Sequence, residues 1–244
     1  MIATANPGKL REFRSLLAGL PFEVTSLGEL ALPSPAETGA SFRENAILKA
    51  RHAATLSGCA AVADDSGLEV DALGGAPGIY SARYAGPGAD DGANNAKLLS
   101  ALQAVQRGPS ANDGPGAQGK SCASKPGEPG EERRARYQCA LVFVAAADAA
   151  PLVAEAAWEG FILDAPRGSG GFGYDPYFWL PELQLTAAEL APEEKNRLSH
   201  RGKAMQALRE ALLAQLAAEM PMAQEQPAAR PDRSEQSDRS RARS

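Results

Sequence analysis

The segment from Asp64 to Tyr84 constrains this chain more than any other feature. It follows a short apolar stretch and combines two adjacent carboxylates, a hydroxyl, a glycine-rich turn and an arginine. Carboxylates can hold a hard cation and position water. Glycines let backbone N–H groups approach phosphate oxygens closely. These are the groups that a magnesium-dependent enzyme needs to handle a polyphosphate.

The two carboxylates of this segment, Asp64 and Asp65, are neighbours in the chain. Neighbouring residues on a strand point to opposite faces, so the pair could share a metal only where a strand ends. We therefore expect a short buried strand over 60–64 that ends at the following Ser-Gly pair, and a further strand over 69–73. The alternative is a plain turn pair at a strand end, which leaves the Gly-Gly-Ala-Pro-Gly run unexplained.

Apolar periodicity and capping residues predict the other elements. A capping box at Ser41 and Glu44 marks the start of one helix. Helices are expected over 8–20, 41–57, 94–105 and 200–218, with a short one starting at 186–189. A hairpin is expected over 136–147 and 151–162, and a glycine-aromatic loop over 168–178. Since helices and strands alternate early and strands cluster later, the expected class is an α/β or α+β sheet protein with a cleft.

Length and composition are those of a globular protein. The 244 residues, 44% of them hydrophobic, can build a sizeable core. We expect one domain over 1–219, interrupted by a flexible insertion over 107–133 and followed by a disordered tail over 220–244. The formal net charge of −5 argues against a nucleic-acid partner. No apolar run approaches the roughly 20 residues that a bilayer span requires, so no membrane association is expected.

The three cysteines, Cys59, Cys122 and Cys139, have no metal-ligand spacing. Cys59 and Cys139 lie beside alanine-rich apolar sequence and are expected to be buried thiols. Together with the absence of a signal peptide, they indicate a reducing, cytoplasmic location.

Three further segments carry charged or aromatic groups with more than one interpretation. The loop over 4–9 joins a strand to a helix, so its backbone N–H groups and its lysine would bind an anion; the alternative is a plain strand–helix turn. Glu37 precedes a helix, where a carboxylate often serves the helix dipole. In the loop over 170–176, Phe172 offers a flat face for stacking, worth about 1–3 kcal/mol, and Asp175 accepts hydrogen bonds. The alternative there is a loop folded on its own core.

Two helical segments add more candidates. Asn45 and Lys49 are four residues apart and share one helix face, although a lone lysine is usually just solvated. Ser199, His200 and Arg201 open the last helix, where Ser199 suits an N-cap. Capping alone would explain this last motif, and substrate contacts are compatible with it.

Taken together and in this order, these segments resemble the inosine/xanthosine triphosphate pyrophosphatase family. The resemblance covers residues 1–219 outside the insertion and rests mainly on the motifs around Asp65 and Tyr174. It implies an α/β fold, an elongated mixed β-sheet with helices forming two lobes around a central nucleotide cleft. It also implies hydrolysis of non-canonical purine nucleoside triphosphates (dITP, ITP, XTP, dXTP) to the monophosphate and pyrophosphate, with Mg²⁺ as cofactor and a homodimeric assembly.

The same resemblance assigns roles to single residues. It makes Asp65 the catalytic residue and a magnesium ligand, with Asp64 supporting it, and Glu37 a second magnesium ligand. The substrate-binding residues that it implies are Thr4, Ala5, Asn6, Pro7, Gly8, Lys9, Lys49, Ser66, Arg83, Phe172, Gly173, Tyr174, Asp175, Lys195, His200 and Arg201. Three of these, Lys195, His200 and Arg201, are hydrogen-bond donors, which suits the 6-oxo group of keto purines.

Two alternatives stay open from the sequence. The first is a related pyrophosphatase that acts on other modified or canonical nucleotides, which a substrate panel would separate. The second is a non-catalytic nucleotide-binding module, which would release no pyrophosphate as wild type and would bind dITP with unchanged affinity after Asp65→Asn.

Overall fold

The computed structural model describes residues 1–4, 6–17, 23–107 and 129–219. A five-stranded sheet in the order β1-β2-β3-β4-β5 forms its centre, and every neighbouring pair of these strands is antiparallel. Among these residues, parallel pairing is confined to isolated bridges of Ile2 with Ser26 and Val62. The chain thus combines helices with one sheet in a mixed α/β fold. The sheet, however, is antiparallel, whereas we expected a sheet with both parallel and antiparallel pairs. Most of the expected insertion and the whole expected tail lie outside the described residues.

The elements have the following bounds. The strands are β1 (Ala61–Val70), β2 (Arg134–Val144), β3 (Leu152–Ile162), β4 (Phe178–Leu180) and β5 (Leu185–Thr186). The α-helices are α1 (Pro7–Leu16), α2 (Phe42–Ser57), α3 (Asp91–Arg107), α4 (Pro192–Leu198) and α5 (His200–Glu219). Short 3₁₀ helices are η1 (Asp71–Leu73), η2 (Gly78–Arg83) and η3 (Glu131–Arg133).

Strand β1 is longer than expected and runs straight through the two aspartates. Asp65 pairs with Ala140 of β2, and Gly67 stays in the ladder opposite Gln138. The prediction that the strand ends at this point is wrong. Gly67 is needed for a close backbone contact and not to end the strand. A Cβ on it would lie 2.5 Å from the carbonyl oxygen of Gly78, so the glycine marks a close approach of η2 rather than the end of a strand.

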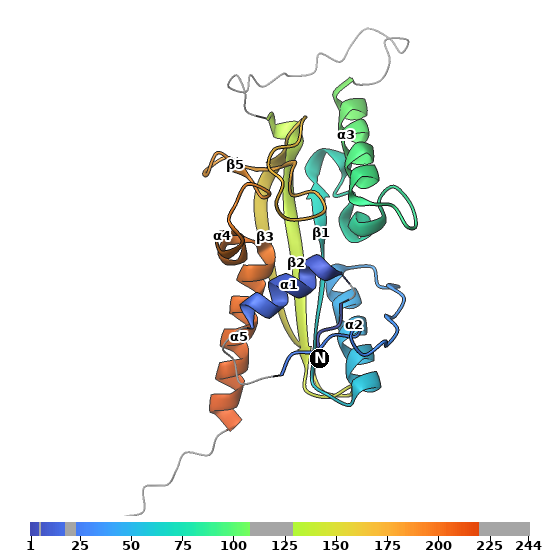
Figure 1. Cartoon of the computed structure of the whole chain (residues 1–244), viewed down its shortest axis with the longest axis vertical. Coiled ribbons are helices and arrows are strands. Elements are labelled where there is room, and N and C mark those ends of the chain that lie inside the picture. Colours follow the sequence, from blue (N-terminus) through green and yellow to red (C-terminus); the bar gives the residue numbers. More distant parts are fainter. Residues whose placement is uncertain (5, 18–22, 108–128, 220–244) are drawn as a thin grey trace, which may run out of the picture.

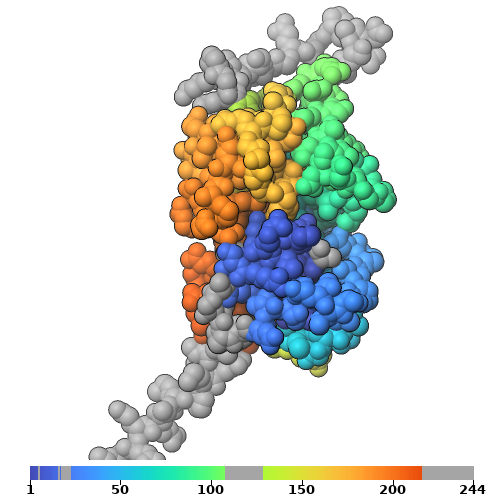
Figure 2. All heavy atoms as spheres, viewed as in Figure 1, coloured from blue at the N-terminus to red at the C-terminus, as the bar shows by residue number. Residues whose placement is uncertain are grey.

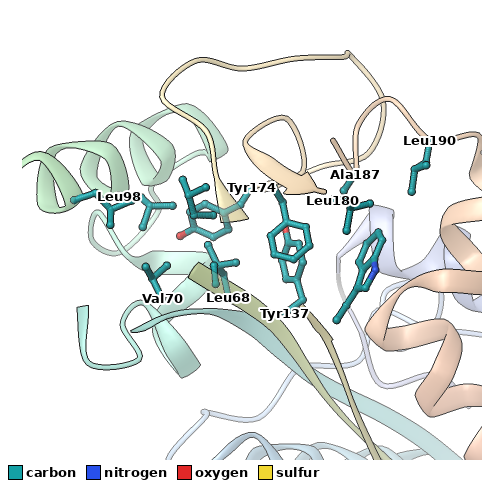
Figure 3. Close-up of a cluster of buried hydrophobic side chains, with 13 residues drawn as sticks. Leu68, Val70, Leu98, Tyr137, Tyr174, Leu180, Ala187 and Leu190 are labelled. Carbon is teal, nitrogen blue, oxygen red and sulfur yellow. The ribbon is translucent and has the colours of Figure 1, made fainter. Parts of the chain in front are cut away.

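Two helical layers cover opposite faces of the sheet (Figure 1). Helix α2 lays its buried alanines, such as Ala46 and Ala50, on the face that carries Ala63. Helices α1 and α5 cover the other face, where Phe13 and Leu208 pack with Leu141. A third cluster lies beneath α3 and β4 and includes Leu68, Leu98, Tyr137, Tyr174 and Phe178 (Figure 3).

Most helix predictions are confirmed at their starts. Ser41 Oγ accepts the N–H of Glu44 at 3.2 Å, which is the predicted cap, and Gly58 ends α2 with φ +65°. Helix α3 begins at Asp91, before the expected residue 94. The hairpin of β2 and β3 is confirmed.

Two local expectations are wrong. No helix starts at 186–189: Thr186 ends strand β5, turns follow it, and the helix begins at Pro192 instead. The Glu189 side chain accepts the N–H of Thr186 at 2.8 Å, as it would at a helix start, but the chain does not continue as a helix. Cys139 is buried as expected, but Cys59 is exposed because it follows the end of α2 in a turn. Cys122 lies outside the described residues. In the described part of the chain, no helix combines the length and hydropathy that a membrane crossing demands.

Gly202, near the start of α5, has no room for a side chain. A Cβ there would lie 1.7 Å from the carbonyl oxygen of Asn196 in α4. We predict that Gly202→Ala forces α4 and α5 apart and lowers the free energy of unfolding by about 1–3 kcal/mol, as overpacking does. Gly28→Ala is the control, because the nearest atom to its Cβ would be 4.0 Å away. Urea unfolding measures both, and equal stability of the two variants would contradict the prediction.

Candidate active site

A cleft of about 190 Å³ opens where the two helical layers meet the middle of the sheet. Figure 2 shows this part of the surface, where the N-terminal segment (blue) meets the segments around α3 (green) and before α5 (orange). The cleft is lined by most of the residues proposed from the sequence: Asn6, Lys9, Glu37, Asp65, Ser66, Arg83, Phe172, Gly173, Tyr174, Asp175, Lys195, His200 and Arg201. Thr4, Pro7, Gly8 and Lys49 are not among the lining residues, and Ala5 lies outside the described residues.

One end of the cleft gathers two carboxylates around one ammonium group. Lys49 Nζ lies 2.6 Å from Asp65 Oδ1 and 3.1 Å from Glu37 Oε1. Asn45 Nδ2 donates to Asp65 Oδ2 at 3.3 Å, and Arg83 pairs with the other oxygen of Glu37. Lys49 and Asn45 reach this point together because they share one face of α2. The lysine is therefore part of the site and not simply solvated.

The pKa values of the two carboxyls move in opposite directions. Burial raises the pKa of Asp65, and Lys49 offsets only part of that rise. Burial also favours the neutral form of Glu37, but Lys49 and Arg83 together lower its pKa below the ordinary value. Asp65 is thus a better proton acceptor than an ordinary aspartate, whereas Glu37 stays ionised.

Asp64 faces the opposite side of β1, toward α1 and α5. Its Oδ2 accepts from Lys9 Nζ at 2.9 Å and from Arg201 at 3.2 Å, and Ser66 Oγ donates to it at 2.9 Å. The carboxyl is fully buried; these cations outweigh the burial and hold its pKa well below the usual range. The expectation that a strand end brings Asp64 and Asp65 together is wrong. Asp64 instead holds two basic side chains in place.

The loop before α1 also differs from the expectation. We expected its backbone N–H groups to bind an anion, but the side chain of Asn6 accepts the N–H of Gly8 at 2.8 Å and that of Lys9 at 3.1 Å. This is an ordinary helix N-cap. The Lys9 ammonium, 15% exposed, remains the group that this loop presents to the cleft.

The other end of the cleft is rich in donors and aromatic rings. Lys195 Nζ lies 2.8 Å from Asp175 Oδ2 and 4.8 Å from the centre of the Phe172 ring. The hydroxyl of Tyr137 donates to Asp175 Oδ1 at 3.2 Å. The His200 ring stacks on Tyr137 with centroids 4.7 Å apart. Burial, with Arg201 and Lys195 nearby, lowers the pKa of His200 well below its ordinary value, so this imidazole is neutral at pH 7.

Phe172 also touches the start of α1. A Cβ on Gly8 would lie 2.6 Å from Phe172 Cδ1, so only glycine allows this contact. The start of α1 and the ring of Phe172 are therefore in direct van der Waals contact.

Several residues of the site were missed in the sequence. Glu12 binds Lys195 Nζ at 2.9 Å and pairs with Arg201, so it joins α1 to α4 and α5. The feature of the sequence that could have indicated Glu12 is its position three residues after Lys9 on the same helix. Asp91 and Asn94 also line the cleft. Adjacent asparagines inside a helix are unusual, because asparagine competes with the helical backbone for hydrogen bonds, and that was the available signal.

Glu12 should make stability depend on pH. Burial favours its neutral form, but Arg201 and Lys195 lower the pKa of Glu12 below its ordinary value in the folded protein. Its stabilising contribution is therefore present above the unfolded pKa of about 4.3 and is lost as pH falls through the lower folded value. We predict that Glu12→Gln lowers the free energy of unfolding at pH 7 by about 1–3 kcal/mol, and that this deficit shrinks below about pH 4.

Urea unfolding at pH 7, 5 and 3.5 measures this dependence. Glu210→Gln is the control, because Glu210 is exposed on α5 and its side chain accepts a hydrogen bond from Gln206 on the same helix. A deficit for Glu12→Gln that stays constant over this pH range would contradict the assignment.

Comparison with known proteins places the chain in a family. A family model described as the Ham1 family matches residues 1–113 and 117–211. The dITP/XTP pyrophosphatase of Methylococcus capsulatus is 51% identical over 205 residues, which cover 84% of this chain and 90% of the relative. The dITP/XTP pyrophosphatase of Vibrio cholerae is 50% identical over 213 residues, which cover 87% and 95%.

Solved structures agree with this placement. The structure of a HAM1 protein from Coxiella burnetii superposes with a TM-score of 0.71 at 41% identity, covering 87% of this chain and 97% of that one. The Ham1 protein of Staphylococcus aureus gives a TM-score of 0.68 at 37% identity, covering 88% and 97%. The resemblance seen in the sequence is confirmed, and the chain belongs to the Ham1 family.

Proposed function

We propose that this protein hydrolyses non-canonical purine nucleoside triphosphates, such as dITP, ITP and XTP, to the monophosphate and pyrophosphate. The observation that carries the proposal is that the two ends of one cleft differ in their chemistry. Carboxylates and cations gather at one end, and hydrogen-bond donors and aromatic rings at the other. Two relatives with 51% and 50% sequence identity are dITP/XTP pyrophosphatases, which supports the proposal. The nucleotide would lie between a lobe built on α2 and a lobe built on α3 and β4.

The carboxylate end suits a divalent cation. Glu37 and Asp65 both approach within 3.1 Å of the single Lys49 Nζ, so their oxygens converge on one point. Among the described residues no group of three or more acidic, cysteine or histidine side chains could hold a metal. Mg²⁺ needs no such cage, because it is commonly bound by one or two carboxylates, water and substrate phosphates. Glu37 and Asp65 would hold it, and it would stabilise negative charge on the phosphates.

The chain's own residues perform the remaining steps. Asp65, whose carboxylate reaches the cleft, would accept a proton from the water that attacks the α-phosphorus. Lys9 and Arg83 would neutralise charge on the departing pyrophosphate. Lys49 holds the Asp65 carboxylate in place through its 2.6 Å contact. The bond between the α-phosphorus and the bridging oxygen breaks, and pyrophosphate leaves.

Base selection would fall to the donor end. The 6-oxo group of hypoxanthine or xanthine accepts hydrogen bonds, whereas the 6-amino group of adenine donates them. Lys195 Nζ is an obligatory donor that already binds Asp175 and Glu12, and its third N–H would be available to the 6-oxo group. An adenine amino group at that point would set donor against donor in a largely buried site. Phe172 would stack on the base.

Product analysis tests the function. We predict pyrophosphate release, with no orthophosphate, from dITP and XTP in the presence of Mg²⁺, and at least about 100-fold lower kcat/KM for dATP and dTTP. Assays of both products with dITP, XTP, dATP, dGTP and dTTP measure this. Orthophosphate would mean attack at the terminal phosphate, and release from canonical nucleotides would favour the related pyrophosphatase.

Two substitutions separate catalysis from binding. We predict that Asp65→Asn lowers kcat by at least about 1000-fold while the fold and dITP binding persist, because the proton acceptor is lost. Glu37→Gln should mainly raise the Mg²⁺ concentration needed for half-maximal rate, since Asp65 remains. Rate measurements against Mg²⁺ and calorimetry with dITP report these effects. Asp65→Asn with wild-type turnover would contradict the assignment.

We also propose a homodimer in a reducing cytoplasm. The turn at Pro77 and Gly78 leads into η2, where Tyr80 is 57% exposed beside Arg83, and this surface is the one that the family resemblance favours for the contact. The free thiols of Cys59 and Cys139 fit a reducing compartment.

A further inference from the structure

We propose that Asp91 and Asn95, in the first turns of α3, are positioning residues that hold the Phe172 loop through the backbone of Gly173. The inference rests on the proposed function, because it assigns Phe172 to the nucleotide base. Neither residue was among those singled out from the sequence.

Both backbone groups of Gly173 are bound by side chains of α3. Asp91 Oδ2 accepts the N–H of Gly173 at 2.6 Å, and Asn95 Nδ2 donates to its carbonyl oxygen at 2.9 Å. Gly173 has φ +64° and open space around its missing side chain. Its conformation is therefore one that the chain adopts readily only with glycine, and α3 holds it from both sides.

The contact between Asn95 and Gly173 leaves one polar atom of the Asn95 side chain without a hydrogen bond in the described part of the chain. Its Nδ2 donates to two carbonyl oxygens, those of Asp91 at 2.8 Å and Gly173 at 2.9 Å. Rotating the amide would place its oxygen against both carbonyls, so the orientation is determined. The side-chain oxygen is then buried without a partner among the described residues. A buried unsatisfied acceptor is unfavourable, which indicates that the contact with Gly173 has a purpose beyond filling space.

We call the two hydrogen bonds from Asp91 and Asn95 to Gly173 the clamp. It lies next to Phe172, the residue that precedes Gly173. The N–H of Phe172 donates to Asp175 Oδ2 at 2.7 Å, and Asp175 is in turn bound by Lys195. Two consecutive N–H groups thus point to two carboxylates from different parts of the chain. Tyr174, on the other side, is buried near Leu98 of α3 (Figure 3) and donates to the carbonyl oxygen of Ser81 at 2.8 Å. With these anchors the Phe172 ring has a defined place over the cleft.

The same turn of α3 reaches the other end of the cleft. Asn94 Oδ1 accepts the N–H of Ala85 at 2.8 Å, and its Nδ2 donates to the carbonyl oxygen of Ala82. These residues flank Arg83, which pairs with Glu37. One helical turn therefore sets the position of the base loop relative to the residues around the phosphates.

Loss of the clamp should weaken substrate binding more than turnover. We expect Asp91→Ala to raise KM for dITP about tenfold with kcat within about twofold, because the loop must be ordered when the base binds. Asp91→Asn should restore KM to near the wild-type value, since its amide oxygen can still accept the Gly173 N–H. Asp90→Ala is the matched control: Asp90 Oδ1 accepts the N–H of Ala93 at 2.7 Å, so the variant weakens the start of α3 without touching Gly173.

A double-mutant cycle shows whether the effect passes through the ring. In a Phe172→Ala background, Asp91→Ala should change KM by less than about twofold, because there is no ring left to position. An unchanged KM for Asp91→Ala, an equal rise for Asp90→Ala, or an undiminished effect without Phe172 would each overturn the inference. Wild-type protein that releases no pyrophosphate from dITP would contradict the proposed function instead, so the two failures are distinguishable.

Discussion

Side-chain alternation along β1 is the constraint on which the rest of the site depends. Because the strand continues through Asp64 and Asp65, the two carboxylates must face opposite sides of the sheet. Each then organises a separate set of charges. Asp65 collects groups from α2, and Asp64 collects groups from α1 and α5. A single strand thereby brings helices from both layers to one cleft.

The buried charges around Asp64 are better understood as positioning than as stabilisation. Removing a carboxylate and an arginine from water costs several kcal/mol for each ion, and their attraction returns little more than that. Asp64 and Arg201 are almost fully buried, and Lys9 is nearly so. What the cluster provides is a defined distance between α1 and α5. Glu12 repeats the device one helical turn further along α1, through Lys195 and Arg201.

The sequence predicted local structure well where one residue has one physical purpose. The N-cap at Ser41, the hairpin and the α5 helix need only short-range rules, and all three are present. The capping box itself is half formed, because Glu44 Oε2 accepts the N–H of Ala40 and not that of Ser41. Gly67 shows where such rules fail. A glycine in a strand suggests a break, but here it makes room for the backbone of η2, a contact that no local pattern contains.

The site was likewise predicted well in its local features and poorly in its long-range contacts. Most of the groups that line the cleft were predicted from their residue types and from the family resemblance, but their partners were not. Asp91 meets Gly173 across 82 positions of sequence, and Glu12 meets Lys195 across 183. Such pairs are determined by how the layers pack, which the periodicity of single elements does not report. The N-cap at Asn6 was hidden for another reason: asparagine before Pro-Gly suits both a turn and a cap.

The contact between Gly8 and Phe172 couples two parts of the cleft wall. The missing side chain of Gly8 lets the start of α1 rest directly on the Phe172 ring. The ring therefore cannot move toward α1 unless the helix moves with it, and Lys9 is the next residue of that helix. A shift of the ring would be passed on to the lysine by direct contact and not through a flexible linker.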